Sequence, residues 1–185
     1  MSIKKIATTS ILASFSISAQ VHADFIGDSK ATLGMRNFYF NNDNRDGSAA
    51  PSKTEEWAQG FMLDYKSGYT NGTVGFGVDA LGLMGVTLDS GKGRHVGSTM
   101  IPSDNDNSAV DEWSRLGLTG KVRMSKTELR YGTLIPKLPI LVANDGRLLP
   151  QTYEGGQITS SEFKDLTLTG GRIEHATGRG STDQT

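Results

Sequence analysis

Apolar and polar residues alternate with a period of two along much of this chain, which is the pattern of β-strands with two different faces. In the first such segment, Leu33 and Met35 alternate with Gly34 and Arg36. Five segments carry the pattern clearly and a sixth is shorter: 30–40, 56–66, 74–80, 113–124, 127–131 and 166–173. A surface helix would instead place apolar residues every three or four positions. The pattern therefore predicts an all-β fold with about six strands.

Short and long connections alternate between these segments. The link before residue 74 contains Asn71-Gly72, which is the strongest short signal for a hairpin, and Ser125 lies in a tight link before residue 127. The stretches 41–54 and 82–111 are longer, polar and irregular. Membrane barrels have the same alternation, with short periplasmic turns and long external loops.

Composition also favours a barrel. Only 36% of the residues are hydrophobic and glycine supplies 23 of the 185, which is little for a soluble core and ordinary for a barrel with a wet lumen. Trp57 and Tyr65 lie near the two ends of one predicted strand face, as in the aromatic girdles of membrane barrels. We therefore predict a transmembrane antiparallel β-barrel.

The N-terminus has the features of an export signal. Lys4 and Lys5 precede a short apolar stretch, 6–17, and Val21-His22-Ala23 fits a cleavage site with small residues. We predict a signal peptide over 1–23 and a mature chain from Asp24. The apolar stretch is too short for a membrane helix, which needs about 20 residues.

Residues 134–164 break the alternating pattern. They contain Pro136, Pro139 and Pro150, which cannot donate to a strand ladder, and a polar centre, Asn144-Asp145-Gly146-Arg147. Long loops with apolar residues of their own are usually functional or packed inward. We predict such a loop here.

Several motifs resemble those of the OprD family of outer-membrane porins, also called outer-membrane carboxylate channels. The motifs that carry the resemblance are Asp24-Phe25-Ile26, Asp28-Ser29, Arg36-Asn37, Tyr131-Gly132-Thr133-Leu134, Pro136, Leu138-Pro139-Ile140-Leu141, Asn144-Asp145, Arg147-Leu148-Leu149-Pro150-Gln151-Thr152-Tyr153 and Leu168-Thr169-Gly170-Gly171-Arg172. Together they extend over nearly all of the predicted mature chain.

The resemblance implies a barrel of about eighteen strands, usually a homotrimer, in the outer membrane of a Gram-negative bacterium. It also implies that 134–164, the third long loop, folds into the lumen as a constriction. Small solutes with a carboxylate, including basic amino acids and aromatic acids, would diffuse through. Since only about six strands are predicted, 24–185 would form the N-terminal portion of such a porin.

Basic residues at alternate positions are the candidates for the solute path. In the predicted phase, the inward-pointing cations include Lys30 and the five that we select as site residues, Arg36, Arg115, Lys121, Arg123 and Arg130. A guanidinium group can bind a carboxylate through two parallel hydrogen bonds. The alternative is that these charges merely solvate the wall and pair with Glu128, Asp64 or Asp79.

Asp145 and Arg147 are the candidates at the constriction. An acid opposite a base at a narrow point would create a transverse field that orients zwitterions. The alternative is a turn in which Asn144 and Asp145 bond their own backbone, as such residues often do.

Other functions find little support. The histidines His22, His95 and His175 have no metal-ligand spacing, and we expect no cofactor and no enzyme activity. The Gly91-Lys92-Gly93 segment lacks the remaining residues of a phosphate loop. The chain has no cysteine, and its net charge of -1 argues against nucleic acid as a partner.

The second hypothesis is an exported soluble β-rich protein for binding or adhesion. The two hypotheses differ in the environment of the apolar strand face, which includes Trp57, Leu63 and Phe76. In a barrel this face contacts lipid, whereas in a soluble sandwich it packs into a core.

Overall fold

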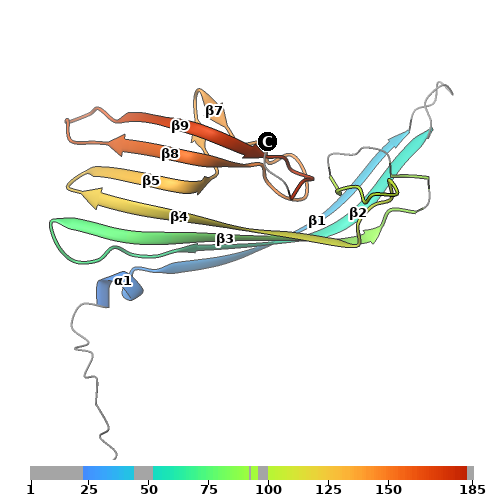
Figure 1. Ribbon diagram of the computed structural model, residues 1–185, viewed down its shortest axis with the longest axis horizontal. Coiled ribbons are helices and arrows are strands. Elements are labelled where there is room, and N and C mark those ends of the chain that lie inside the picture. Colours follow the sequence, from blue (N-terminus) through green and yellow to red (C-terminus); the bar gives the residue numbers. More distant parts are fainter. Residues whose placement is uncertain (1–22, 44–51, 92, 96–99, 183–185) are drawn as a thin grey trace, which may run out of the picture.

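The fold is a long curved sheet (Figure 1). The computed structural model describes residues 23–43, 52–91, 93–95 and 100–182, and the predicted signal peptide falls almost entirely outside these residues. A short helix, α1 (Ala23–Gly27), precedes the sheet. The sheet consists, in spatial order, of β1 (Lys30–Asp43), β2 (Lys53–Lys66), β3 (Val74–Asp89), β4 (Glu112–Met124), β5 (Thr127–Leu134), β8 (Thr152–Ser160) and β9 (Leu168–Thr177).

Each strand of this sheet pairs antiparallel with the next one along the chain. The register of β1 and β2 runs without interruption from Lys30 opposite Lys66 to Asp43 opposite Lys53. The short links lie at the end of the sheet near α1, and the long loop between β3 and β4 lies at the other end (Figure 1). Among the described residues, β1 and β9 are the two edges of the sheet. The described part of the chain has no helix with the length and hydropathy of a membrane span.

The predicted strand phase is confirmed by the burial pattern. One face exposes large apolar side chains, among them Leu33, Met35, Phe76, Leu116 and Leu118. The other face carries cations such as Arg36, Arg115 and Lys121 and is partly covered by loops. Such an alternation is expected where one face meets lipid and the other an aqueous lumen.

The sheet has seven strands, one more than predicted. The additional strand, β8, lies within 134–164, which the sequence predicts as a single loop. Its Gly155-Gly156 pair and polar residues obscure the alternation of apolar residues. The segment between β5 and β8 is therefore shorter than predicted, and it contains a two-stranded hairpin, β6 (Lys137–Leu138) and β7 (Leu141–Val142).

Strand β3 is also longer than predicted, because it continues to Asp89 instead of ending near Ala80. Leu81 and Leu83 lie on its inner side, and Leu83 is almost completely buried there. Since both faces of this part of β3 are apolar, the period of two disappears from the sequence although the strand continues.

A small hydrophobic core lies on the inner face of the sheet. The wall contributes Ala58, Leu83 and Trp113, the loop between β3 and β4 contributes Met100 and Ile101, and the segment between β5 and β8 contributes Leu148 and Leu149. Glycine at position 60 permits this packing, because a Cβ atom there would lie only 3.1 Å from Cγ of Leu148. The core thus holds the loop between β3 and β4 and the segment between β5 and β8 against the strands of the sheet.

Candidate functional site

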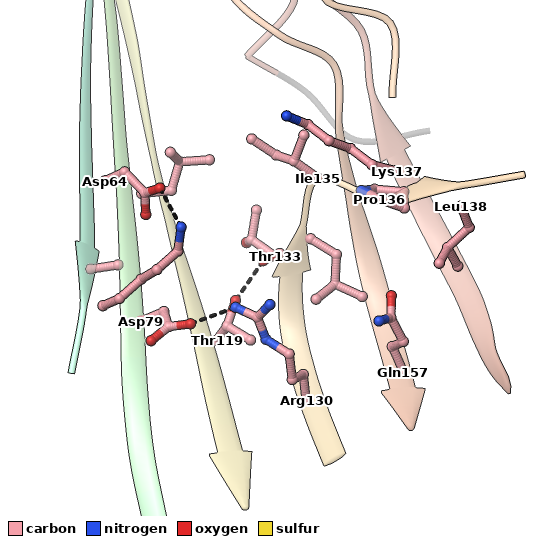
Figure 2. Close-up of a pocket in the computed structure, with 14 residues that line it drawn as sticks. Asp64, Asp79, Thr119, Arg130, Thr133, Ile135, Pro136, Lys137, Leu138 and Gln157 are labelled. Carbon is pink, nitrogen blue, oxygen red and sulfur yellow. Dashed lines mark hydrogen bonds and ion pairs between the residues drawn. The ribbon is translucent and has the colours of Figure 1, made fainter. Parts of the chain in front are cut away.

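A pocket of about 400 Å³ lies between the inner face of the sheet and the segment that follows β5. Figure 2 shows Ile135, Pro136, Lys137 and Leu138 on one side of it, opposite the polar side chains of the strands. The pocket lining contains charges of both signs: Asp64, Lys66, Asp79, Arg130 and Lys137. A water-filled path with such a wall can attract ions without holding them tightly.

Asp79 joins two of the predicted cations. Its carboxylate oxygens lie 2.6 Å from Nζ of Lys121 and 2.5 Å from a guanidinium nitrogen of Arg130. Figure 2 shows Arg130 of β5 reaching across β4 toward Asp79 of β3. Both cations therefore have a wall carboxylate as partner, which is the pairing that the alternative interpretation expects.

Tyr69, in the link between β2 and β3, organises the end of the wall near α1. The ring lies beneath the guanidinium group of Arg123, 4.1 Å from its centroid, and beneath Nζ of Lys121 at 4.8 Å. Its hydroxyl donates a hydrogen bond to the Glu128 carboxylate. Burial and this carboxylate raise the pKa of Tyr69 above its usual range. Arg123 itself is exposed and keeps its hydrogen-bonding edge available.

The two candidates for the constriction do not pair with each other. Asp145 instead forms two hydrogen bonds, of 2.8 and 3.0 Å, with the guanidinium group of Arg36 on β1. The same guanidinium donates to the carbonyl oxygen of Arg147 at 2.5 Å. Arg36 therefore ties the segment after β7 to the opposite part of the wall.

Arg147 is placed differently from the other cations. Its guanidinium carbon lies 4.7 Å from the centroid of the Phe40 ring, and it donates one long hydrogen bond of 3.4 Å to the carbonyl of Gly146. Among the described residues it has no carboxylate partner. Of the predicted turn contacts, that of Asn144 is present, because the Gly146 N–H donates to its side-chain oxygen, whereas the Asp145 carboxylate binds Arg36.

Arg115 has mainly a structural position. Its guanidinium donates hydrogen bonds to the carbonyl oxygens of Pro150, Gly178 and Ser181. It connects β4 with the end of the inserted segment and with the residues after β9, and solutes would compete with these carbonyls for it.

The seven predicted residues thus form three groups. Arg36, Lys121 and Arg130 share carboxylates with Asp145 and Asp79, Arg115 binds carbonyls, and Arg123 and Arg147 stack on aromatic rings. Sequence reasoning missed Lys137 and Gln157, which line the pocket, because both lie in the region assigned to an irregular loop. No group of side chains suited to a metal ion occurs among the described residues.

The fold and sequence match known porins. A family model described as outer membrane porin, OprD family, covers residues 23–185. The porin-like protein GalP of Pseudomonas putida is 50% identical over 155 residues, 84% of this chain and 37% of that protein.

Solved structures give the same result. The crystal structure of Pseudomonas aeruginosa OccK9 (OpdG) is 52% identical with a TM-score of 0.83, over 87% of this chain and 41% of that one. The crystal structure of Pseudomonas aeruginosa OpdK with vanillate is 43% identical with a TM-score of 0.78, over 87% and 40%. This chain spans about two fifths of the length of these relatives. It belongs to the OprD family of outer membrane porins.

Proposed function

We propose that this chain forms the N-terminal wall of a complete porin, through which small carboxylate-bearing solutes diffuse across the outer membrane. Basic amino acids and aromatic acids are the solute classes that we expect. The crystal structure of OpdK with vanillate, a small aromatic carboxylate, supports this choice. The second hypothesis, a soluble exported binding protein, is not favoured, because the relatives of the chain are channel proteins.

The observation that carries the proposal is the position of Arg147. Its guanidinium is stacked on Phe40 and lacks a carboxylate partner among the described residues, so its planar donor edge can receive a passing carboxylate. The neighbouring Arg36–Asp145 pair presents both charges beside it. Together these charges suit a solute that carries a carboxylate, or a zwitterion that carries both a carboxylate and an ammonium group.

Weak binding at several positions suits diffusion better than one tight site, because a solute must also leave. Among the described residues, Arg147, Arg123 and Lys137 are cations without a carboxylate partner near the inner face. Lys121 and Arg130 are shared with Asp79, which reduces their attraction for an anion. We propose that the three available cations carry the carboxylate along the lumen and that the complete barrel lies in lipid as a homotrimer.

Liposome swelling with the complete porin tests the selectivity. We expect Arg147→Ala to reduce the uptake of a small carboxylate more than that of its uncharged amide, since both have nearly equal size. Arg147→Lys should recover part of the difference, because it keeps the charge but not the planar fork. Lys164→Ala, which removes an exposed cation from the link between β8 and β9, is the matched control. An unchanged carboxylate-to-amide ratio in a folded Arg147→Ala barrel would contradict this role of Arg147.

A further inference from the structure

A buried polar cluster lies outside the proposed solute path. Glu56 on the inner face of β2 is completely buried, and its Oε1 lies 2.6 Å from Nδ1 of His95. The other ring nitrogen of His95, Nε2, lies 2.7 Å from Oγ of Ser103. We call Glu56, His95 and Ser103 the anchor. Burial of such groups is costly unless they are hydrogen-bonded, so the bonds hold the three residues together.

The order of the three side chains is that of an acyl-transfer triad, but the surroundings do not support catalysis. The two backbone N–H groups that follow Ser103 are already used: that of Asp104 donates to the carbonyl of Ser108, and that of Asn105 donates to the Asp104 carboxylate. Neither is free to stabilise an oxyanion. The contacts of the cluster instead favour a role in holding the chain in place.

The anchor joins both limbs of the loop between β3 and β4 to the wall. His95 belongs to the outgoing limb and Ser103 to the returning limb. Next to it, Arg94 binds the Glu55 carboxylate at 2.8 Å, and the Glu55 N–H donates to the Arg94 carbonyl at 3.2 Å. The loop is thus fixed to β2 through two successive residues of the strand.

The fixed loop in turn covers the segment after β5. In the sequence, Met100 and Ile101 lie between His95 and Ser103, and both are fully buried against Leu148 and Leu149. Leu148 directly follows Arg147, whose carbonyl accepts a hydrogen bond from Arg36. A displacement of the loop would therefore free Leu148 and Leu149, whose packing keeps the adjacent Arg147 in place.

We propose that His95 is a positioning residue for the channel, which fixes the width and the selectivity of the lumen through Met100, Ile101 and the segment that carries Arg147. The selectivity part rests on the proposed function, whereas the width does not. Two readouts on the complete porin separate them: the single-channel conductance in planar bilayers and the permeation ratio of a small carboxylate to its amide.

Four variants test the proposal, with heat-modifiable migration as the check of folding. We expect His95→Ala to lose the single conductance level of the parent porin and to bring the carboxylate-to-amide ratio toward unity. His95→Asn keeps a donor for Glu56 and should restore the conductance level. Asn105→Ala, at an exposed position of the same loop, should resemble the parent.

A folded His95→Ala barrel with the parent's conductance level and ratio overturns the proposal. If His95→Ala does not fold, Ser103→Ala decides, because it cuts only the bond to the returning limb. A folded Ser103→Ala barrel with unchanged conductance then overturns it. A parent porin without carboxylate preference would contradict the proposed function alone, since the conductance level still reports the position of the loop.

Discussion

Replacing Asp79 by alanine should destabilise the porin far more than the same change at Asp64. Both carboxylates lie on the inner face and pair with a lysine, at 2.6 Å for Asp79 with Lys121 and at 2.8 Å for Asp64 with Lys66. The pairs differ in burial. The Asp79 and Lys121 side chains are 9% and 7% exposed, whereas Asp64 and Lys66 are 42% and 55% exposed.

The expected magnitudes follow from this difference. Asp79→Ala leaves the buried Lys121 cation without a counter-charge, which typically costs about 3 to 5 kcal/mol, and leaves Arg130 with only the more distant carboxylate of Glu128, at 3.7 Å. Asp64→Ala breaks an exposed pair, which is worth at most about 1 kcal/mol. The double variant Asp79→Ala with Lys121→Met should recover part of the loss, because the buried cation is removed together with its partner.

The assay is urea unfolding of the complete porin in lipid vesicles, followed by the fluorescence of the tryptophans. Trp113 is buried on the inner face and Trp57 is exposed on the outer face, so both sides of this wall are reported. Equal losses of unfolding free energy for Asp79→Ala and Asp64→Ala would refute the argument from burial. A double variant no more stable than Asp79→Ala would show that the unpaired Lys121 is not the cause.

Three further predictions concern the wall and its turns. Leu116→Arg, at an outward position that is 72% exposed, should lower the folded yield on gels, because a cation near the bilayer midplane costs about 2 to 4 kcal/mol. Ile140→Arg, at a loop position that is 92% exposed, should fold normally, and equal yields of the two variants would mean that Leu116 does not face lipid. Gly132→Ala should also lower the folded yield, because φ is +132° there and a Cβ atom would overlap a carbonyl of β4. A Cβ atom at Gly120 meets no close neighbour, so Gly120→Ala should be tolerated, and normal folding of both variants would contradict the overlap at Gly132. The pKa of Glu162 is lowered mainly by a hydrogen bond from a backbone N–H of the turn between β4 and β5. The stabilisation that its carboxylate gives is therefore present at neutral pH, and it is lost as the pH falls below the ordinary glutamate pKa of about 4.3. Glu162→Gln should therefore weaken the acid dependence of the urea midpoint, and an unchanged dependence would contradict this assignment.

The wall was largely predictable because its two faces meet different solvents. The period of two located β1, β2, β4, β5 and most of β9, and it gave the correct direction for the apolar side chains. It failed where that contrast disappears. The end of β3 is apolar on both faces because loops cover its inner side, and β8 contains too few apolar residues to show a period.

The candidate site was predictable only as a set of inward cations. Their partners depend on contacts between distant segments, such as Arg36 with Asp145, which lie 109 residues apart. Asp145 pairs with the wall instead of opposing Arg147, because the inserted segment crosses to β1. The anchor was not predicted either, since His95 lies in an irregular loop and no local pattern relates it to Glu56.

The position of the hydrophobic core on the inner face implies that apolar residues on the two faces of this wall evolve under different constraints. Lipid is a fluid that fits any apolar shape, so Leu116 and Phe76 can drift among leucine, isoleucine, valine and phenylalanine without a matching change elsewhere. Leu148 and its partners fill a closed space against Gly60, where a change of volume at one position requires compensation at another. Among descendants of this sequence, coordinated substitutions should therefore concentrate on the side of the wall that faces water.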